Sequence, residues 1–419
     1  MNVAGSPNVV VVGGGIVGIA SAHYLSSAGL DVTVVDRREI GSGCSHANCG
    51  YICPSHVLPL TEPGAIGLAL KSMFQPNAPF RVKPRLSPAL LRWMLEFARR
   101  CRHQTMLESG KHLQAILESS MREYRTLVAN EVFKGQWKTN GLLYVFRSSS
   151  ALAKFSDTCD MIRENFGVAA SKISGSDLPE FDPALRSGLA GACYYEDDCS
   201  VRPDQVISQW VENLRDRGVR FIENCDVHSL QRKQSRLASL STNSGELAAE
   251  KFVFATGAWS PTFASELGCR IPIEPGKGYS ITMSRPNPCP THPMLFPEHK
   301  VGVTPFDDGY RLGSIMEFAG YDTRISAKRI EQLKRSAVPY LQSPYTTDVK
   351  ETWYGWRPMT WDSLPIIGQV PGLDNVFLAT GHNMLGLSLA PSTGRLIGEL
   401  VSGQTTHLDV APYSPARFR

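Results

Sequence analysis

The 419-residue chain has no uninterrupted apolar stretch of about 18 residues, the length that a membrane-spanning helix needs. It has no long run of like charge, and its net charge of only +4 excludes the strongly basic surface of a nucleic-acid-binding protein. The N-terminal apolar stretch lacks a preceding cationic segment and contains three consecutive glycines, so we expect no signal peptide. Without a secretory signal, the ten cysteines predict free thiols in a reducing compartment. We therefore expect a cytoplasmic protein without a nucleic-acid partner.

The N-terminal segment has the pattern of a dinucleotide-binding βαβ unit. A β-branched run leads into Gly-Gly-Gly-Ile-Val-Gly at 13–18, an apolar helix follows, and a second apolar run ends at Asp36. In such a unit Gly13 permits the tight turn, Gly15 lets the backbone approach a pyrophosphate, and Gly18 lets the helix lie close to the strand. Asp36 lies 18 residues past Gly18, close to the spacing of about 20 for a carboxylate that accepts from a ribose hydroxyl. The arginine after this acid would also suit a 2′-phosphate, so the unit alone leaves a nicotinamide cofactor open.

Two later segments predict further strands of the same sheet. Apolar runs at 251–255 and 375–379 are each followed by Thr-Gly, which indicates buried strands that end in small-residue turns. Together with the N-terminal unit, they predict one sheet built from separated parts of the chain. Alternating residues at 278–282 predict a second sheet with one covered face.

The predicted fold class is therefore α/β, with a Rossmann-like domain built from discontinuous segments and an α+β second domain. The second domain would contain a mixed or antiparallel sheet and helices. We expect the first domain over 1–60, 197–268 and 345–419, and the second over 61–196 and 269–344.

A basic amphipathic helix is predicted over 89–102. Its apolar stripe would comprise Leu90, Leu91, Met94, Leu95 and Ala98, with arginines on the rest of its surface. Such a helix either packs on its own domain with a solvated basic face or lies on a membrane surface. The packed helix is the simpler interpretation, and a peripheral contact with the inner face of a membrane stays open.

Three cysteines lie close together in the loop that follows the βαβ unit. Cys44, Cys49 and Cys53 alternate with His46 and His56, but their spacing does not match an iron–sulfur pattern. We interpret the cysteines as small apolar residues and expect no metal. Metal or cluster binding and a covalent cysteinyl-flavin remain the alternatives.

Several motifs in order give the chain a resemblance to a known family. They are the Gly-rich unit with Asp36, Ser-x-Ala-Asn-x-Gly at 45–50, Gly-Lys-Gly-Tyr-Ser at 276–280, Gly-Trp-Arg-Pro-Met-Thr at 355–360, and Thr-Gly-His at 380–382 with Gly386. The chain resembles the FAD-dependent D-amino acid dehydrogenases of the D-amino acid oxidase and glycine oxidase superfamily, including the D-hydroxyproline type.

The resemblance implies that the cofactor is FAD and not NAD. The glycine turn would hold the pyrophosphate, the acid the adenosine ribose, the backbone at Val227 the adenine, and the 45–50 loop the diphosphate and isoalloxazine. The amides of Leu385 and Gly386 would face the flavin pyrimidine ring. The implied cofactor-binding residues are Gly13, Gly15, Ile16, Val17, Gly18, Asp36, Arg37, Ser45, Ala47, Asn48, Gly50, Val227, Thr256, Gly257, Gly381, Leu385 and Gly386.

Three residues are candidates for the reaction itself. The planar guanidinium of Arg357 is suited to bind a substrate carboxylate by two parallel hydrogen bonds. Tyr279 would donate to the same carboxylate or line the pocket, and His382 would contact the flavin. The alternatives are an ordinary ion pair for Arg357, core packing for Tyr279 and a backbone-satisfied turn for His382.

The function implied is hydride transfer from the α-carbon of a D-amino acid, or of a cyclic D-imino acid such as a D-proline derivative, to FAD. The expected electron acceptor is a quinone or a carrier protein. The alternatives are a glycine- or sarcosine-type oxidase that uses dioxygen, and a flavin-binding subunit that only relays electrons within a complex.

Overall fold

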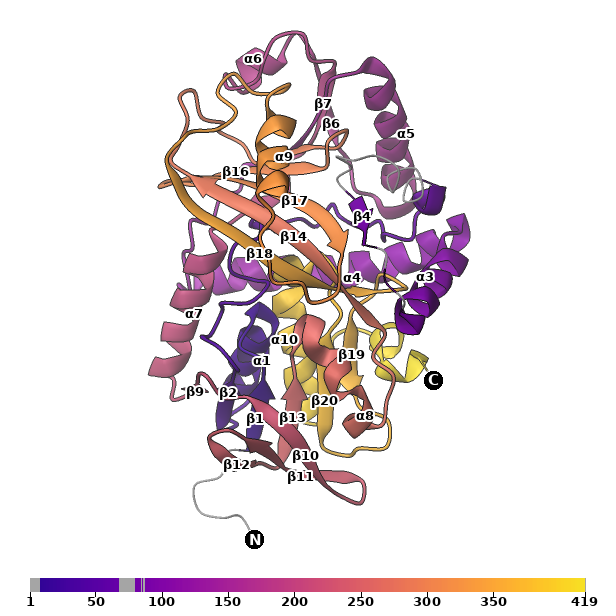
Figure 1. Ribbon diagram of the computed structural model, residues 1–419, viewed down its shortest axis with the longest axis vertical. Helices are drawn as coiled ribbons and strands as arrows, with labels where there is room; N and C mark the ends of the chain where they lie inside the picture. Colours follow the sequence, from indigo (N-terminus) through magenta and orange to yellow (C-terminus); the bar gives the residue numbers. More distant parts are fainter. Residues whose placement is uncertain (1–7, 68–79, 84, 86, 419) are drawn as a thin grey trace.

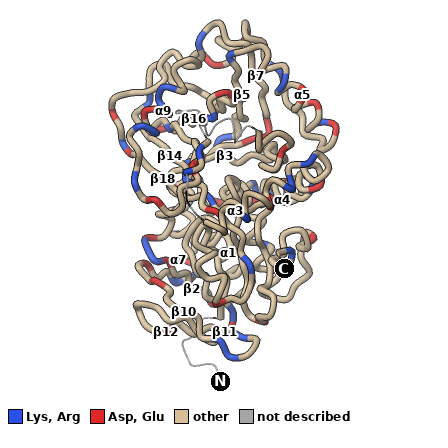
Figure 2. The backbone as a smooth tube through the Cα atoms, turned by 45° about the vertical axis from the view of Figure 1, so that its right-hand side comes forward, with Lys and Arg blue, Asp and Glu red and all other residues tan. Residues whose placement is uncertain are grey.

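The computed structural model describes residues 8–67, 80–83, 85 and 87–418. The described chain forms two lobes, the lower one in Figure 1 built on a six-stranded sheet and the upper one on a nine-stranded sheet. Lys and Arg are interspersed with Asp and Glu in both lobes (Figure 2). The predicted segments 1–60 and 61–196 include positions that lie outside the described residues.

The six-stranded sheet is the predicted Rossmann-like sheet. Its strands in spatial order are β19 (Ile366–Gln369), β20 (Val376–Thr380), β13 (Lys251–Phe254), β1 (Val9–Val12), β2 (Val32–Val35) and β9 (Arg220–Ile222). All neighbours pair in parallel except β19, which runs antiparallel to β20. The strands β1, β2 and β20 are buried along their whole length, which explains their apolar runs without alternation. The predicted sheet from separated segments, and with it the α/β class, is confirmed.

Four helices pack around this sheet: α1 (Ile16–Ser27), α4 (His103–Ala129), α7 (Pro203–Asp216) and α10 (Gly386–Val401). Helices α1, α7 and α10 lie close in sequence to strands of this sheet, but α4 comes from the segment predicted for the other domain. Leu113 and Ile116 of α4 belong to the same hydrophobic core as Val9 and Val11 of β1. Helix α4 therefore joins the core of the lower lobe.

The nine-stranded sheet forms the upper lobe. Its strands in order are β18 (Val349–Thr360), β14 (Ile273–Met283), β17 (Tyr310–Phe318), β16 (Val301–Pro305), β15 (Met294–Phe296), β5 (Leu142–Phe146), β7 (Gly191–Tyr195) and β6 (Ser171–Ser174), with β4 (Phe80–Val82) beside β17. The pairs β15–β5 and β17–β4 are parallel and the others antiparallel, so the sheet is mixed.

Smaller elements complete the fold. The remaining strands are β3 (Tyr51–Ile52) paired with β8 (Cys199–Ser200), and a small sheet of β10 (Val227–Lys233), β11 (Arg236–Thr242) and β12 (Gly245–Ala248). The remaining helices are α3 (Pro88–Arg100), α5 (Ser149–Phe166), α6 (Leu178–Phe181), α8 (Ala264–Leu267) and α9 (Ala327–Ala337). Short 3-10 helices are η1 (Gly257–Phe263), η2 (Ala411–Tyr413) and η3 (Pro415–Phe418).

The prediction of one covered face is wrong for β14, because all of its residues are buried. The polar positions of the alternating pattern are covered as well. Ser280 donates to the carbonyl oxygen of Ala47 at 2.8 Å, and the Thr282 hydroxyl accepts from Arg311 Nε at 2.9 Å. A polar face that hydrogen-bonds a neighbouring loop has the same sequence pattern as a face exposed to water.

The predicted stripe of α3 is also wrong in part. Leu90 and Trp93 are the buried residues of the helix, and Met94 packs against the same core. Leu91 and Leu95 are 61% and 53% exposed. The helix therefore buries the face centred on Trp93 and presents two leucines to the outside.

The predicted domain division remains a prediction. Of three features that bear on it, the first and the third below cross the division, and the second lies within the predicted first domain. Strand β18 lies within the predicted segment 345–419 and pairs with β14 of the upper sheet. Strand β8, in segment 197–268, pairs with β3. Helix α4 packs on α10 although its residues fall in segment 61–196.

Candidate functional site

A cavity of about 1660 Å³ lies between the two sheets. Its walls include residues at the carboxyl ends of β1, β2 and β20 in the lower lobe and residues of β14, β17 and β18 in the upper lobe. Open α/β sheets bind ligands at the carboxyl ends of their strands. The volume exceeds that of a typical pocket for one small ligand, so the cavity has room for a dinucleotide and a substrate.

The glycine turn shapes one end of this cavity. Gly13 has φ +109°, and a Cβ there would lie 2.5 Å from the carbonyl oxygen of Ala255. A Cβ at Gly18 would clash with the carbonyl oxygen of Gly13, so helix α1 and its strand approach as closely as the motif predicts. Gly15 is the N-cap of α1 and gives that helix no side-chain cap. The start of α1, including Ile16 and Val17, therefore faces the cavity with donors suited to a diphosphate.

Asp36 and Arg37 follow β2 at the same end. The Asp36 carboxylate accepts from the backbone N–H groups of Gly14, at 2.8 Å, and Arg38, at 2.9 Å, which fixes its position. The Arg37 guanidinium lies 3.5 Å from the centre of the Trp259 ring, and its partial burial lowers its pKa. Arg37 is therefore stacked on an aromatic ring at the adenosine end of the cavity.

The other predicted residues of this end also line the cavity. Val227 begins β10, and Thr256 and Gly257 follow β13. The Thr256 hydroxyl lies 2.9 Å from that of Ser260, and the carbonyl oxygen of Gly257 accepts from the Thr380 hydroxyl at 3.0 Å. These bonds join the two Thr-Gly turns. Gly381, with φ +72°, continues the second turn but is not among the residues that line the cavity, although its neighbours Thr380 and His382 are.

The 45–50 loop is held from the upper sheet by three side chains that the sequence did not reveal. Ser280 of β14 donates to the carbonyl oxygen of Ala47 at 2.8 Å, Arg311 of β17 to that of Asn48 at 2.8 Å, and Thr304 of β16 to that of Cys49 at 2.5 Å. We call Ser280, Thr304 and Arg311 the loop anchors. Arg311 is 1% exposed, and burial lowers its pKa. Three consecutive carbonyl groups of the loop are therefore directed at side chains of the upper sheet.

Within the loop, Ser45 and Asn48 make local bonds. The Ser45 hydroxyl accepts from the N–H of Ile16 at 3.1 Å, which ties the loop to the start of α1. Asn48 donates to the carbonyl oxygen of Ser45 at 2.8 Å and accepts from the N–H of Gly50 at 2.7 Å. The predicted loop residues Ser45, Ala47, Asn48 and Gly50 thus form one connected turn along the cavity wall.

Of the cysteines in this region, Cys53 is buried and Cys44 and Cys49 are half-buried. Burial raises the pKa of Cys44 to about 11 and raises that of Cys49 and Cys53. The neighbouring histidines have other partners, since His46 Nε2 lies 2.7 Å from Glu351 and His56 Nε2 lies 2.5 Å from the Tyr144 hydroxyl. Among the residues that the structure describes, no group of three or more His, Cys, Asp or Glu could hold a metal ion. The absence of a metal remains a prediction.

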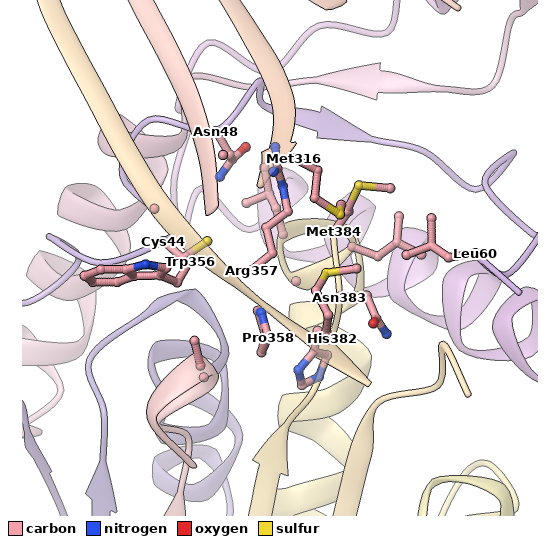
Figure 3. A pocket seen from close by; sticks show the side chains of 18 of the residues that line it. Cys44, Asn48, Leu60, Met316, Trp356, Arg357, Pro358, His382, Asn383 and Met384 are labelled. Carbon is pink, nitrogen blue, oxygen red and sulfur yellow. The ribbon is translucent and has the colours of Figure 1, made fainter. Parts of the chain in front are cut away.

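Arg357 projects into the middle of the cavity from β18 (Figure 3). A Cβ at Gly278 on the adjacent strand would clash with its guanidinium, so this glycine makes room for the side chain. Nη1 donates to the carbonyl oxygen of Ile315 at 2.9 Å. No carboxylate of the described residues forms an ion pair with Arg357, so the ion-pair alternative has no support. Burial lowers its pKa, which favours capture of an anionic partner.

Tyr279 and His382 have other partners. The Tyr279 hydroxyl donates to Glu317 Oε2 at 2.9 Å, and the side chain belongs to the upper core, as the packing alternative predicts. His382 Nε2 lies 2.9 Å from the Thr393 hydroxyl, and burial lowers its pKa to about 3, so the ring is neutral at neutral pH. Leu385 and Gly386, at the start of α10, line the cavity. The N–H of Leu385, predicted to face the flavin, donates to the carbonyl oxygen of His382 at 2.9 Å.

Two further cavity residues carry buried polar atoms without a hydrogen-bond partner in the described structure: Trp356 Nε1 and Ser363 Oγ. Such atoms are rare in folded proteins and indicate a missing partner. Together with the start of α1, whose N-cap residue Gly15 has no side chain, they fit a cavity built to hold a large polar cofactor.

The family comparison agrees with this geometry. Residues 8–400 match the family model described as FAD dependent oxidoreductase. The chain belongs to this family and is an FAD-dependent oxidoreductase.

Individual relatives extend the match over the whole chain. The chain is 34% identical over 424 residues to a D-amino acid dehydrogenase of Paramagnetospirillum magneticum, covering 98% of each chain. It is 32% identical over 403 residues to a D-amino acid dehydrogenase of Vibrio vulnificus, covering 94% of this chain and 96% of the relative.

Solved structures share the fold. Glycine oxidase from Geobacillus kaustophilus has a TM-score of 0.77 at 23% identity, covering 98% of this chain and 99% of that one. L-proline dehydrogenase from P. horikoshii has a TM-score of 0.76 at 22% identity, covering 99% and 98%. The predicted family and the predicted FAD are confirmed.

Proposed function

We propose that the protein dehydrogenates D-amino acids, or cyclic D-imino acids such as D-proline derivatives, at the α-carbon. The observation that carries the proposal is Arg357, a cation that projects into the cavity and has no carboxylate partner in the described structure. The names of the Paramagnetospirillum and Vibrio relatives support the substrate class. An electron-relay subunit would have no use for such a cation, so Arg357 favours an enzyme that binds an acid.

Arg357 would bind the substrate carboxylate through two charge-assisted hydrogen bonds. When bound, FAD supplies the hydride acceptor. With the carboxylate fixed and the α-hydrogen directed at the flavin, one direction remains for the side chain, which sets the enantiomer. Water then hydrolyses an acyclic imine to the oxo acid and ammonia. The neutral His382 would pack beside the cofactor, whereas the bond between Tyr279 and Glu317 favours a supporting role for the tyrosine.

The cofactor would extend from Asp36 and Val227, at the adenosine end, past the start of α1 to the 45–50 loop and the start of α10. All of these elements line the cavity. The two ends of the cofactor would therefore be bound mainly by the lower lobe, and the substrate by the upper lobe.

For the electron acceptor we propose a quinone or a carrier protein. None of the helices in the described part of the chain is both long and apolar enough to cross a bilayer. The exposed leucines of α3, Leu91 and Leu95, lie beside the exposed Arg92 and Arg99, which suits a peripheral contact with an anionic membrane surface.

Anaerobic mixing of the purified holoenzyme with matched D- and L-amino acids tests the proposal. We expect D-amino acids to bleach the flavin absorbance and their L-enantiomers not to. Bleaching by neither enantiomer would remove the proposed function. In air, peroxide formation as fast as dye reduction would favour the glycine-oxidase alternative.

A further inference from the structure

One wall of the cavity beside Arg357 is entirely apolar. It comprises Leu60, Trp93, Met94, Phe97, Met316 and Phe318, all of which line the cavity. We call these residues the apolar wall. Figure 3 shows Met316 beside Arg357 and Leu60 farther to the right.

The aromatic part of the wall is packed into a fixed shape. The Trp93 ring stacks on Phe97 with centroids 5.2 Å apart and lies 5.4 Å from the Phe318 ring. Trp93 Nε1 donates to the carbonyl oxygen of Met359 at 3.0 Å. The only polar atom of these rings is therefore satisfied by the backbone of β18, and the wall offers carbon and sulfur atoms to a ligand.

The wall begins directly beside the carboxylate anchor. Arg357 Nη1 donates to the carbonyl oxygen of Ile315, and Met316 is the next residue of β17. A molecule whose carboxylate is bound by Arg357 therefore has the wall within reach of its side chain. Methionine side chains adapt to apolar groups of different shape, so Met94 and Met316 would accept more than one of them.

Arg357 is the charged residue beside the wall, and Lys154, Lys300 and Glu62 also line the cavity. None of the wall residues carries a charge. A charged or strongly polar side chain placed against the wall would lose its hydration without gaining a partner, which is unfavourable.

We infer that the apolar wall is the side-chain subsite and that the substrates are D-amino acids with large apolar side chains, such as leucine, methionine and phenylalanine. This inference rests on the proposed function. Each buried methylene is worth about fourfold in binding. We therefore expect kcat/KM for D-leucine or D-methionine to exceed that for D-alanine by roughly tenfold or more.

The first test is a panel of D-alanine, D-serine, D-aspartate, D-lysine, D-leucine, D-methionine and D-phenylalanine with an artificial electron acceptor. A binding series of acetate, butyrate and hexanoate, followed by the change in flavin absorbance, measures the same subsite without turnover. We expect kcat/KM to be highest for the apolar substrates and the Kd to fall from acetate to hexanoate. D-Aspartate or D-serine turned over as well as D-leucine would overturn the inference, and so would equal binding of acetate and hexanoate.

A charged variant of the wall sharpens the test. Met316→Lys should lower kcat/KM for D-leucine by roughly tenfold or more and weaken hexanoate, with acetate little changed. Val349→Lys, at the 40%-exposed start of β18, is the matched control and should leave both unchanged. Equal turnover of D-leucine by Met316→Lys and the control would contradict the assignment of the wall.

The outcomes separate this inference from the proposed function. If no D-amino acid bleaches the flavin but hexanoate still binds more tightly than acetate, the proposed reaction is wrong and the apolar subsite stands. If D-amino acids are oxidised without preference for apolar side chains, the reaction stands and the subsite is wrong.

Discussion

The two ends of the cavity are built in different ways. The adenosine end has a local nucleus, because the glycine turn and Asp36 belong to one βαβ unit, and Val227 and Thr256 join it from later segments. The substrate end is assembled from Gly278, Ile315 and Arg357, which lie on three different strands. We expect the first end to bind FAD through backbone groups and the Asp36 carboxylate, and the second to bind the substrate through the side chain of Arg357. Substitutions at the adenosine end should therefore lower FAD occupancy, and substitutions at the substrate end should lower kcat/KM.

The largest effect is expected at the adenosine end. Gly15→Val should abolish FAD binding, because its branched side chain would occupy the path of the pyrophosphate. The backbone of Gly15 has φ −74°, and a Cβ there would meet only the Ser45 hydroxyl, at 3.5 Å, so the chain should still fold. The measurements are the flavin-to-protein absorbance ratio and the circular dichroism spectrum. Full flavin occupancy in a folded Gly15→Val protein would show that the cofactor lies elsewhere.

At the substrate end, Arg357→Leu should lower kcat/KM for D-amino acids by roughly a hundredfold or more. The estimate follows from two charge-assisted bonds of about 1.5–3 kcal/mol each, with tenfold per 1.36 kcal/mol. FAD should remain bound. Arg357→Lys should recover only part of the activity, because an ammonium group cannot reproduce the paired geometry. Near-normal turnover by Arg357→Leu with FAD bound would falsify the carboxylate assignment.

The loop anchors bond the 45–50 loop to the upper sheet. The variant Arg311→Met tests whether this support contributes to FAD binding. Arg311 supports the Asn48 carbonyl from behind the loop, so its loss should weaken FAD binding by roughly tenfold, the value of one charge-assisted bond. The Kd of FAD from titration of the apoprotein measures this. Arg324→Met is the control, because that arginine lies on the surface and pairs with Asp322. An unchanged flavin affinity and flavin spectrum in a folded Arg311→Met protein would assign Arg311 to packing alone.

The smallest effect concerns the pair of His46 and Glu351, whose side chains lie 2.7 Å apart and join the 45–50 loop to β18. The pair raises the pKa of His46 and lowers that of Glu351. Its stabilisation is therefore present between the ordinary pKa values of Glu and His. It is lost as pH rises through the raised pKa of His46, and also as pH falls through the lowered pKa of Glu351. Both side chains are about one-third exposed, so we expect under about 1 kcal/mol.

His46→Gln should accordingly lower the Tm more at pH 6 than at pH 8.5. The matched variant His103→Gln, at the exposed start of α4, should show no such difference. An equal loss at both pH values would mean that the histidine acts through packing and not through its charge.

Sequence reasoning succeeded where the structure is local. The βαβ unit, the two Thr-Gly strands and the mixed second sheet follow from runs of apolar residues and their turns. It failed where a surface is covered by a distant segment. Ser280 and Thr282 have the pattern of an exposed strand face but are buried against the 45–50 loop and Arg311.

The same limitation applies to the site. The position of Arg357 in its motif indicated a carboxylate anchor, but the loop anchors have no local pattern, since each is a single polar residue within a strand. For α3, periodicity alone did not show which of two adjacent apolar faces is buried. That choice depends on Phe318, which packs against Trp93 from another part of the chain.

The loop anchors also have a consequence for the order in which the protein folds. Ser280, Thr304 and Arg311 bond loop residues that are 233, 255 and 263 positions away in the chain. Contacts of such sequence separation form late, because a long loop must close before they stabilise the chain. The βαβ unit can take shape from its own sequence, whereas the loop beside the flavin reaches its final form only once the upper sheet has assembled. During synthesis the glycine turn and Asp36 would therefore take their places before the 45–50 loop reaches its final position.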